Sequence, residues 1–313
     1  MKPSVYITED EVRKLLPMGD CIRLMQTAFE RLGTGEAINQ PRRRLILPTN
    51  SALHYMAASD GKYYGAKIYA TNPRYGAHFL FLLYRAADAE PLALIEANNL
   101  GQIRTGAASG LATKFMARAD AATLAIIGSG FQARTQLEAM LAVRPIAETR
   151  VWSRAAAKRD AFAAETTAAF GTPVQAAATA EQAVRGADII VTATFAKEPV
   201  LAAEWVPAGA HINAMGSNQA GRRELPTDLV KRADRIVVDS MEQARMESGD
   251  LLMALEEADW HSPRIVELKD IVSGGELART SPAAITLFKS NGLAVEDVIA
   301  AAFVYERAAG LHS

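Results

Sequence analysis

The pattern of hydrophobic and polar positions changes in character near residue 120. From residue 121 onward, short apolar or β-branched runs alternate with longer stretches rich in Ala, Glu, Lys and Arg. This alternation predicts a parallel sheet with helices on both faces. The predicted strands are 123–127, 149–153, 188–194, 211–216 and 235–240, and the intervening helices include 155–169 and 179–186.

The first part of the chain follows a different pattern, which predicts an α+β domain. A helical pattern near 9–33 is followed by strand-like runs with hairpin-like spacing. These runs are 44–47, 52–57, 63–70, 78–84 and 91–96. A last amphipathic helix is predicted over 292–310. We place the boundary between the two parts near residue 118.

Composition and charge narrow the class of protein. A chain of 313 residues, half of them hydrophobic, is long enough for two domains. Its 34 basic and 35 acidic side chains leave a formal net charge of -1, which argues against a nucleic-acid partner. No apolar run reaches the roughly 20 residues that span a bilayer. Cys21 is the only cysteine, which excludes an internal disulfide. We therefore expect a soluble cytoplasmic protein without a membrane partner.

A glycine-rich turn follows the first strand of the second part. Residues 128–133 read Gly128-Ser129-Gly130-Phe131-Gln132-Ala133, between an apolar strand and a helix. Gly128 permits a tight turn, Gly130 allows a pyrophosphate to approach the backbone, and Ala133 permits close packing of helix on strand. The free N–H groups at the helix start would face the phosphates, and Phe131 and Gln132 begin that helix. The context favours a dinucleotide site over an ordinary strand-to-helix turn.

The end of the second strand of this part bears on cofactor choice. An NAD site has an acidic residue about 20 positions beyond the turn, whereas this chain has Ser153 and Arg154, with Lys158 one helical turn later. No carboxylate there would repel a 2′-phosphate, and Arg154 could pair with one. We therefore predict a preference for NADP(H), with NAD(H) as the alternative. In the other interpretation, Arg154 and Lys158 are solvated residues at a helix start.

Other candidate cofactor contacts lie where the later strands end. Ligands of open parallel sheets bind at the carboxyl ends of the strands. The residues expected there are Thr192, Thr194, Met215 and Gly216.

Cationic residues in the first part suggest a carboxylate site. Strand alternation sends Arg42 and Arg44 to one face and Arg43 to the other. Lys67 interrupts an apolar run, where a charge is costly without a partner. Arg104 opens a stretch of small residues that would let a ligand approach. Cations that converge on one pocket would bind a small carboxylate, whereas each residue alone could be a surface charge or part of an ion pair.

The whole assembly resembles the ornithine cyclodeaminase/mu-crystallin family. The segments that carry the resemblance run in the right order through nearly the whole chain: QPRR, GAKIYATNP, IRTGAASGLATKFMA, IIGSGFQA, VWSR, GADIIVTAT, PAGAHINAMGSNQAGRREL, SGDLL and TLFKSNGLAVEDV. The resemblance implies a substrate-binding and dimerisation domain of residues 1–118 and 293–313, and a Rossmann-type dinucleotide domain of residues 119–292. It also implies a homodimer whose first domains pair through their sheets.

The resemblance assigns roles to particular positions. Arg43, Lys67 and Arg104 resemble the family residues that hold the substrate carboxylate, with Lys67 also contacting the amine. Burial and two arginines should depress the pKa of Lys67 and let it act as an acid or base on the substrate nitrogen. Thr105 and Lys289 are expected near the cofactor. Asp297 belongs to the C-terminal motif and is expected to be structural.

Two positions depart from the cyclodeaminase pattern. Asn218 stands where cyclodeaminases carry a proton-handling aspartate, and an amide can orient a substrate but cannot take its proton. His54 stands where they carry a glutamate. Without both carboxylates, recognition of a distal ammonium is disfavoured. We keep Asn218 as a candidate catalytic residue, with a role confined to loop or nicotinamide contacts as the alternative.

These expectations lead to an NAD(P)H-dependent oxidoreductase that acts on the C–N bond of a small α-imino or α-amino acid, of the ketimine reductase or amino-acid dehydrogenase type. One alternative is an ornithine cyclodeaminase-type lyase that recycles its own NAD. Another is a mu-crystallin-like protein that binds NADPH with little turnover. No His, Cys, Asp and Glu spacing suggests a metal site.

Overall fold

The computed structural model describes residues 5–311 and divides into two compact units. Unit 1 contains the residues up to 107 and those from 292, and unit 2 comprises 108–291. The sequence placed the first boundary near 118, whereas the change of unit falls inside helix α3 (Asn98–Met116). Arg104 therefore lies in the second turn of this helix rather than at its start.

Unit 1 is built on a seven-stranded sheet. Its order is β1-β7-β6-β5-β4-β2, with β3 also paired to β4. Every pairing is antiparallel except that of β1 with β7. The strands are β1 (Val5–Ile7), β2 (Ile38–Asn39), β3 (Arg43–Ile46), β4 (Ala52–Ser59), β5 (Tyr63–Asn72), β6 (Gly76–Arg85) and β7 (Pro91–Glu96).

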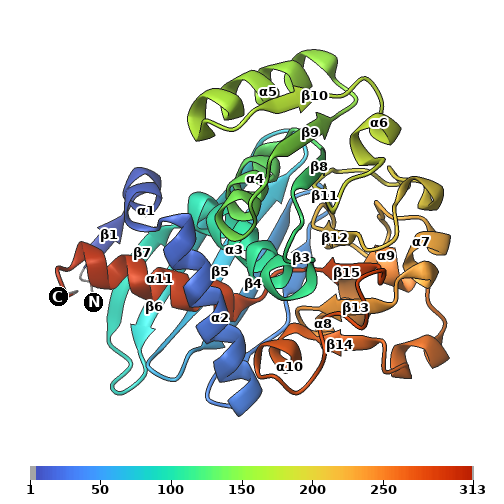
Figure 1. Ribbon diagram of the computed structural model, residues 1–313. Coiled ribbons are helices and arrows are strands. Elements are labelled where there is room, and N and C mark those ends of the chain that lie inside the picture. The colour runs from blue at the N-terminus through green and yellow to red at the C-terminus, as the bar shows by residue number, and fades with distance from the viewer. Residues whose placement is uncertain (1–4, 312–313) are drawn as a thin grey trace. The chain divides into compact units, whose positions relative to one another are not determined.

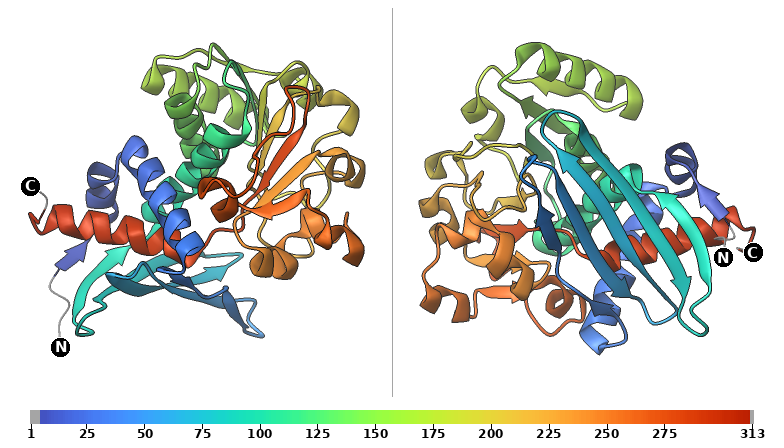
Figure 2. Two further views of the ribbon diagram at one scale, coloured as in Figure 1. Left: turned by 60° about the horizontal axis from the view of Figure 1, so that its bottom comes forward. Right: turned by 180° about the vertical axis from the view of Figure 1, so that it is seen from behind.

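Helices cover one face of this sheet. Helix α11 (Ala294–Ala308) packs across β4, β5 and β6, and α2 (Met18–Thr34) packs on α11 (Figure 1). The right view of Figure 2 shows the opposite face of the long strands with no helix over it. Helix α2 buries an apolar stripe at helical spacing, which is the pattern of a helix with one face on a core. The stripe consists of Met18, Cys21, Ile22, Met25, Ala28 and Phe29.

The single helix expected near 9–33 is two helices. Helix α1 (Glu9–Leu15) ends before Pro17, and α2 begins after it. Proline disfavours the helical conformation in the residue before it and cannot donate a backbone hydrogen bond. The prediction of one continuous helix was therefore wrong at Pro17.

Unit 2 contains an eight-stranded sheet in which every pairing is parallel. The order is β10-β9-β8-β11-β12-β15-β13-β14. The strands are β8 (Thr123–Ile127), β9 (Glu148–Trp152), β10 (Val174–Ala176), β11 (Ile189–Thr192), β12 (His211–Ala214), β13 (Arg235–Val238), β14 (Ile265–Glu267) and β15 (Thr286–Lys289). The chain leaves β8 toward β9 and β10 and returns to β11, so the topological switch point lies between β8 and β11.

Helices flank this sheet, and Figure 1 shows α4 and α5 beside the strands that they connect. They are α4 (Phe131–Val143), α5 (Ala156–Phe170), α6 (Ala180–Val184), α7 (Thr227–Arg232), α8 (Met241–Glu247), α9 (Gly249–Leu252) and α10 (Leu268–Val272), with short 3₁₀ helices at Ala203–Trp205 and Glu257–His261. The expected fold class, a Rossmann-type parallel sheet with a separate α+β domain, is confirmed. Strands β10, β14 and β15 were not predicted.

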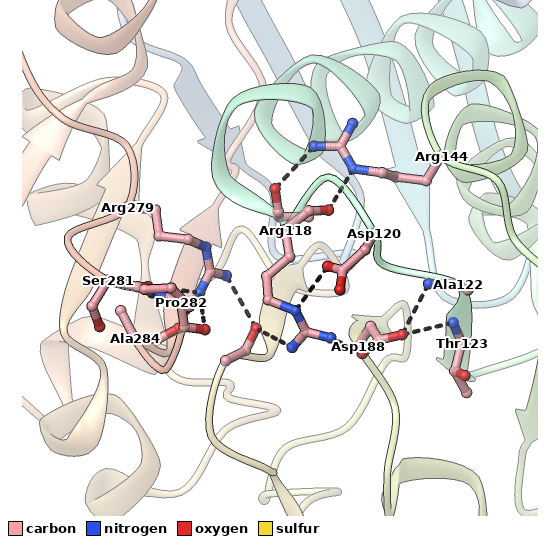
Figure 3. Close-up of polar contacts among 12 residues, drawn as sticks. Arg118, Asp120, Ala122, Thr123, Arg144, Asp188, Arg279, Ser281, Pro282 and Ala284 are labelled. Atoms are coloured by element: carbon pink, nitrogen blue, oxygen red, sulfur yellow. Dashed lines mark hydrogen bonds and ion pairs between the residues drawn. The ribbon is translucent and has the colours of Figure 1, made fainter.

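Three arginines tie together the amino-terminal edge of this sheet and the end of α3 (Figure 3). Arg144 donates to the carbonyl oxygens of residues 113, 114, 117 and 118, where α3 has unsatisfied acceptors. Arg279 donates to Met116 and Gly209, among other carbonyls. Arg118 pairs with Asp188, whose other oxygen accepts from the backbone N–H groups of residues 122 and 123. Charged side chains thus stabilise this edge, because the arginines donate hydrogen bonds to backbone carbonyl oxygens and Asp188 accepts them from backbone N–H groups.

Candidate active site

A buried cluster of opposite charges lies in unit 1. Lys67 Nζ donates to Asp297 Oδ1 at 2.9 Å, and Arg104 Nε donates to the same oxygen at 3.0 Å. Arg104 Nη1 also pairs with Glu296 Oε2 at 2.7 Å. None of the four residues is more than 6% exposed. The structure thus brings together Lys67 and Arg104 as expected, and adds two carboxylates that the sequence did not place there.

Three elements of unit 1 supply this cluster. Lys67 stands in the middle of β5, Arg104 in α3, and the two carboxylates in the first turn of α11. Gly101 makes the approach of α3 to Lys67 possible, because a Cβ there would lie 2.6 Å from Nζ. Asp297 was expected to be structural, but it contacts both cations directly.

The environment of the cluster sets its protonation. Burial lowers the pKa of Lys67 to about 8, with Arg104 and Arg42 acting in the same direction and Asp297 opposing them. Burial disfavours the charged form of Asp297, but Arg104 and Lys67 outweigh it and lower the pKa of that carboxyl. Burial likewise opposes the charge of Arg104, whose pKa is nevertheless raised by Asp297 and Glu296. Lys67 is therefore the group of the cluster that exchanges a proton near neutral pH.

Of the three consecutive arginines, Arg42 faces this cluster and Arg43 does not. Arg42 is 3% exposed, and its Nη2 donates to the carbonyl oxygen of Gly292 at 3.2 Å. Gly292 also abuts Arg104, since a Cβ there would lie 2.5 Å from Nη1. Arg43 is exposed and pairs in register with Tyr55 on the opposite face of the sheet. The alternation read from the sequence predicts this difference, whereas the family resemblance pointed to Arg43.

His54 lies on the helix-covered face of the same sheet. Its ring stacks on Tyr69 with the centroids 4.3 Å apart, and Nε2 lies 3.0 Å from Thr71 Oγ1. Burial, with Arg44 and Arg42 nearby, lowers the pKa of His54 to about 4. The imidazole is therefore neutral at pH 7 and supplies no negative charge for a distal ammonium.

The glycine-rich turn of unit 2 has the geometry of a dinucleotide site. Gly128 adopts φ +117°, and a Cβ there would collide with the carbonyl oxygen of Ala193. A Cβ at Gly130 would meet open space, and no side chain caps the helix that begins at Phe131. Ala133 is fully buried under this first turn. The start of α4 thus has room for a phosphate at Gly130 and no side-chain cap in its place, and the residues present fit the cofactor.

The end of β9 lies beside this turn. Ser153 Oγ is 2.8 Å from Ser129 Oγ, which joins the strand end to the glycine-rich turn. Arg154 and Lys158 are exposed. No carboxylate occurs between Trp152 and Lys158, as the sequence shows.

The remaining predicted contacts lie on their expected elements. Thr192 ends β11, Thr194 follows it, and Met215 and Gly216 follow β12 at the same edge of the sheet. Asn218 lies two residues further along that loop. Thr105 follows Arg104 in α3 of unit 1.

Lys289 is held inside unit 2. It is fully buried, and its Nζ donates to Ser217 O at 2.6 Å and pairs with Asp250 at 3.1 Å. Two further buried groups at this edge, Glu224 and Asp250, were not singled out from the sequence. Both could have been found from the segments of the family pattern that contain them, REL for Glu224 and SGD for Asp250.

Within residues 5–311, no helix has the length and apolar character to cross a bilayer. In the same range, no three His, Cys, Asp or Glu side chains are arranged to hold a metal ion.

Known proteins resemble this chain over nearly its whole length. The family model described as the ornithine cyclodeaminase/mu-crystallin family matches residues 3–311. A Δ1-pyrroline-2-carboxylate reductase of Bacillus cereus is 38% identical over 97% of this chain and 96% of its own length. The Δ1-pyrroline-2-carboxylate reductase of Thermococcus litoralis, solved with NADH and L-proline, is 34% identical, covers 98% of both chains and has a TM-score of 0.93. An archaeal alanine dehydrogenase dimer with bound NAD is 31% identical over 98% of this chain and 97% of its own, with a TM-score of 0.92.

These relatives are reductases and dehydrogenases of imino and amino acids. They confirm the predicted enzyme class, an NAD(P)-dependent oxidoreductase that acts on the C–N bond of a small α-imino or α-amino acid. The chain belongs to the ornithine cyclodeaminase/mu-crystallin family.

Proposed function

We propose that this protein reduces a cyclic α-imino acid of the pyrroline-2-carboxylate type to the corresponding amino acid, with NADPH as the preferred cofactor. The observation that carries the proposal is the buried Lys67–Asp297–Arg104 cluster with Arg42 beside it. The resemblance over nearly the full length to two Δ1-pyrroline-2-carboxylate reductases supports the choice of substrate.

The charge of the cluster matches one carboxylate. Arg42, Lys67 and Arg104 carry three positive charges, and Glu296 and Asp297 carry two negative ones, so these five buried groups sum to +1. A buried excess charge is costly, and a monocarboxylate ligand would neutralise it. Arg42 and Arg104 are the proposed contacts of that carboxylate, and Arg42 replaces Arg43 in this role.

Lys67 is the proposed proton donor to the imine nitrogen. When bound, a nicotinamide dinucleotide supplies the hydride to the substrate carbon. A protonated nitrogen makes that carbon a better acceptor, and an ammonium with a pKa of about 8 can give up its proton near neutral pH. Asp297 holds Nζ in place, so Lys67 keeps a fixed direction in the cluster.

The side chain of the substrate is proposed to be uncharged. His54 is neutral at pH 7, and Asn218 provides an amide rather than a carboxylate. Neither could pair with a distal ammonium. We assign Asn218 a hydrogen-bonding role toward a bound ligand rather than a proton-transfer role.

The preference for NADPH rests on the end of β9. Arg154 directly follows Ser153, where an NAD site would present an acidic residue, and Lys158 lies one helical turn later; both cations are exposed. Their charges would attract a 2′-phosphate.

A homodimer is proposed through the uncovered face of the unit 1 sheet. Arg43, Tyr55, Ile68 and Leu80 form one cross-strand row over β3, β4, β5 and β6, and all four side chains are exposed. Tyr55, Ile68 and Leu80 make three neighbours of this row apolar, and a contiguous apolar patch on an open sheet face is typical of an interface. The archaeal alanine dehydrogenase relative is a dimer. Light scattering should give twice the chain mass for the wild type and the monomer mass for Ile68→Asp.

The experiment that tests the proposed reaction follows absorbance at 340 nm. The panel contains Δ1-pyrroline-2-carboxylate, its six-membered homologue, and 2-oxo acids with ammonia or methylamine, each with NADPH and with NADH. Ornithine with NAD is run alongside for ammonia release. Stoichiometric loss of NADPH on a cyclic imine is expected. Ammonia from ornithine without net cofactor loss would establish the cyclodeaminase alternative, and NADPH binding without turnover would establish the binding-protein alternative.

A further inference from the structure

Glu224 is a buried carboxylate at the carboxyl edge of the unit 2 sheet, and it holds two loops at once. Its Oε1 accepts from the backbone N–H and the hydroxyl of Thr194, each at 2.7 Å. Its Oε2 accepts from Thr192 Oγ1 at 2.8 Å and from the N–H of Gly216 at 2.7 Å. The ends of β11 and β12 are therefore fastened to one side chain that is 0% exposed.

Two further buried charges support this arrangement. Asp250 Oδ1 accepts from the N–H groups of Glu224 and Leu225 at 2.6 and 2.9 Å. Lys289 pairs with the other oxygen of Asp250 and donates to Ser217 O. The loop from Gly216 to Leu225, which carries Asn218, is thus anchored at both of its ends.

The loop after β11, one of the two that Glu224 holds, adjoins the glycine-rich turn. The N–H of Ala193 donates to Ile127 O, and Gly128 packs directly against Ala193 O, one residue before Thr194. The strand order is β9-β8-β11-β12. A dinucleotide that straddles the switch point places its adenosine half toward β9, which leaves the nicotinamide half for β11 and β12.

We propose that Glu224 is a positioning residue for the nicotinamide half of the cofactor, because it sets the loops after β11 and β12 that this half would contact. The inference rests on the proposed dinucleotide-dependent function. Glu224 is not a catalytic residue in this proposal, because each of its oxygens already accepts two hydrogen bonds from the loops that it holds.

A carboxylate is required at this position because all four partners are donors. Each carboxylate oxygen accepts from one backbone N–H, so a glutamine would turn its amide N–H₂ toward one of these N–H groups and lose that hydrogen bond, whereas a threonine hydroxyl could accept instead of donate. Burial and the neighbouring Asp250 raise the pKa of Glu224, while the hydroxyls of Thr194 and Thr192 and the charge of Lys289 act against that rise.

The test compares two ligands that differ in the nicotinamide. NADH and ADP-ribose, which lacks the nicotinamide ring, are titrated into wild type and Glu224→Gln by calorimetry. We expect Glu224→Gln to weaken NADH binding about tenfold, since hydrogen bonds to a charged group are lost. ADP-ribose affinity should change less than about twofold, because the glycine-rich turn and the end of β9 are untouched. Thr194→Val, which removes one donor and keeps the carboxylate, should shift the same ratio in the same direction by less, and serves if Glu224→Gln does not fold.

Asp188→Asn is the matched control. Asp188 is also a carboxylate that accepts from two backbone N–H groups, but it lies at the amino-terminal ends of β8 and β11, at the other edge of the sheet (Figure 3). The Asp188→Asn variant should leave the ratio of NADH affinity to ADP-ribose affinity unchanged even if its melting temperature falls. Equal weakening of both ligands in Glu224→Gln, or unchanged NADH binding, would overturn the inference. A wild-type protein that binds neither of these ligands and does not bind NADPH would instead contradict the proposed function.

Discussion

Lys67 Nζ lies 2.9 Å from Asp297 Oδ1, although the two residues are 230 positions apart in the chain. The contact joins the middle of β5 to the first turn of α11, and both side chains are at most 4% exposed. Asp297 is the close carboxylate of the buried Lys67 ammonium and is shared with Arg104, and this contact holds the ammonium in one place. The pKa of Lys67, about 8, lies close to neutral pH.

Lys67→Met should abolish most of the turnover. Methionine matches the length of the lysine stem but cannot donate a proton, and general acid catalysis by one positioned group contributes roughly 10² to 10⁴-fold. NADH binding, measured by fluorescence, should persist. Lys62→Met is the control, because Lys62 is exposed and pairs with Glu306 at the surface. Near-full turnover in Lys67→Met would contradict the proposed role.

The rate of imine reduction should fall as the pH rises through about 8. Reduction needs Lys67 in its protonated form, and this form is lost above the pKa. Oxidation of the amino acid needs the neutral amine and should rise through the same pH. Asp297 raises the pKa of Lys67, so Asp297→Asn should move both limbs to lower pH. A kcat/KM profile of wild type and variant checks this, and identical limbs in the two proteins would exclude Lys67 as the titrating group.

Arg42→Ala should raise the KM for the imino acid at least about tenfold, as expected for the loss of a charge-assisted contact. Arg43→Ala should change the KM less than about twofold, because Arg43 lies on the other face of the sheet. Steady-state kinetics of the two variants give a direct comparison. The reverse order of effects would restore the assignment that the family resemblance suggested.

Arg154→Ala should weaken NADPH and leave NADH nearly unchanged. A 2′-phosphate would lose its guanidinium partner, which is worth about tenfold or more in affinity. Arg159→Ala is the control, since Arg159 pairs with Asp160 within α5. Equal Michaelis constants for the two cofactors in the wild type, unaltered in Arg154→Ala, would refute the predicted preference.

Arg144→Ala should destabilise the protein by about 3 kcal/mol without altering the charge cluster of unit 1. Four carbonyl oxygens at the end of α3 would lose a charged donor, and each such bond contributes roughly 0.5 to 3 kcal/mol. Arg185→Ala is the control, because an exposed pair with Glu181 contributes about 0.5 kcal/mol at most. Urea unfolding measures both variants, and equal midpoints would show that Arg144 contributes little.

Local patterns determined much of this protein without the structure. The alternation of strands and helices and the turn at Gly128 depend on neighbours within a few residues, so both can be predicted from the sequence. The same holds for the opposite faces of Arg42 and Arg43, which follow from the period of a strand. The break at Pro17 could also be predicted from local sequence, because proline interrupts a helix, whereas the hydrophobic pattern alone predicted one continuous helix.

The tertiary structure decided which charges meet. Asp297 and Glu296 looked like ordinary residues of a helix start, and only the packing of α11 across β5 brings Asp297 to Lys67. Strand β15 pairs between β12 and β13, which no local pattern specifies, and this pairing buries Lys289 beside Asp250. Buried ion pairs depend on contacts between distant segments, because their energy arises from desolvation and geometry that neither segment has alone.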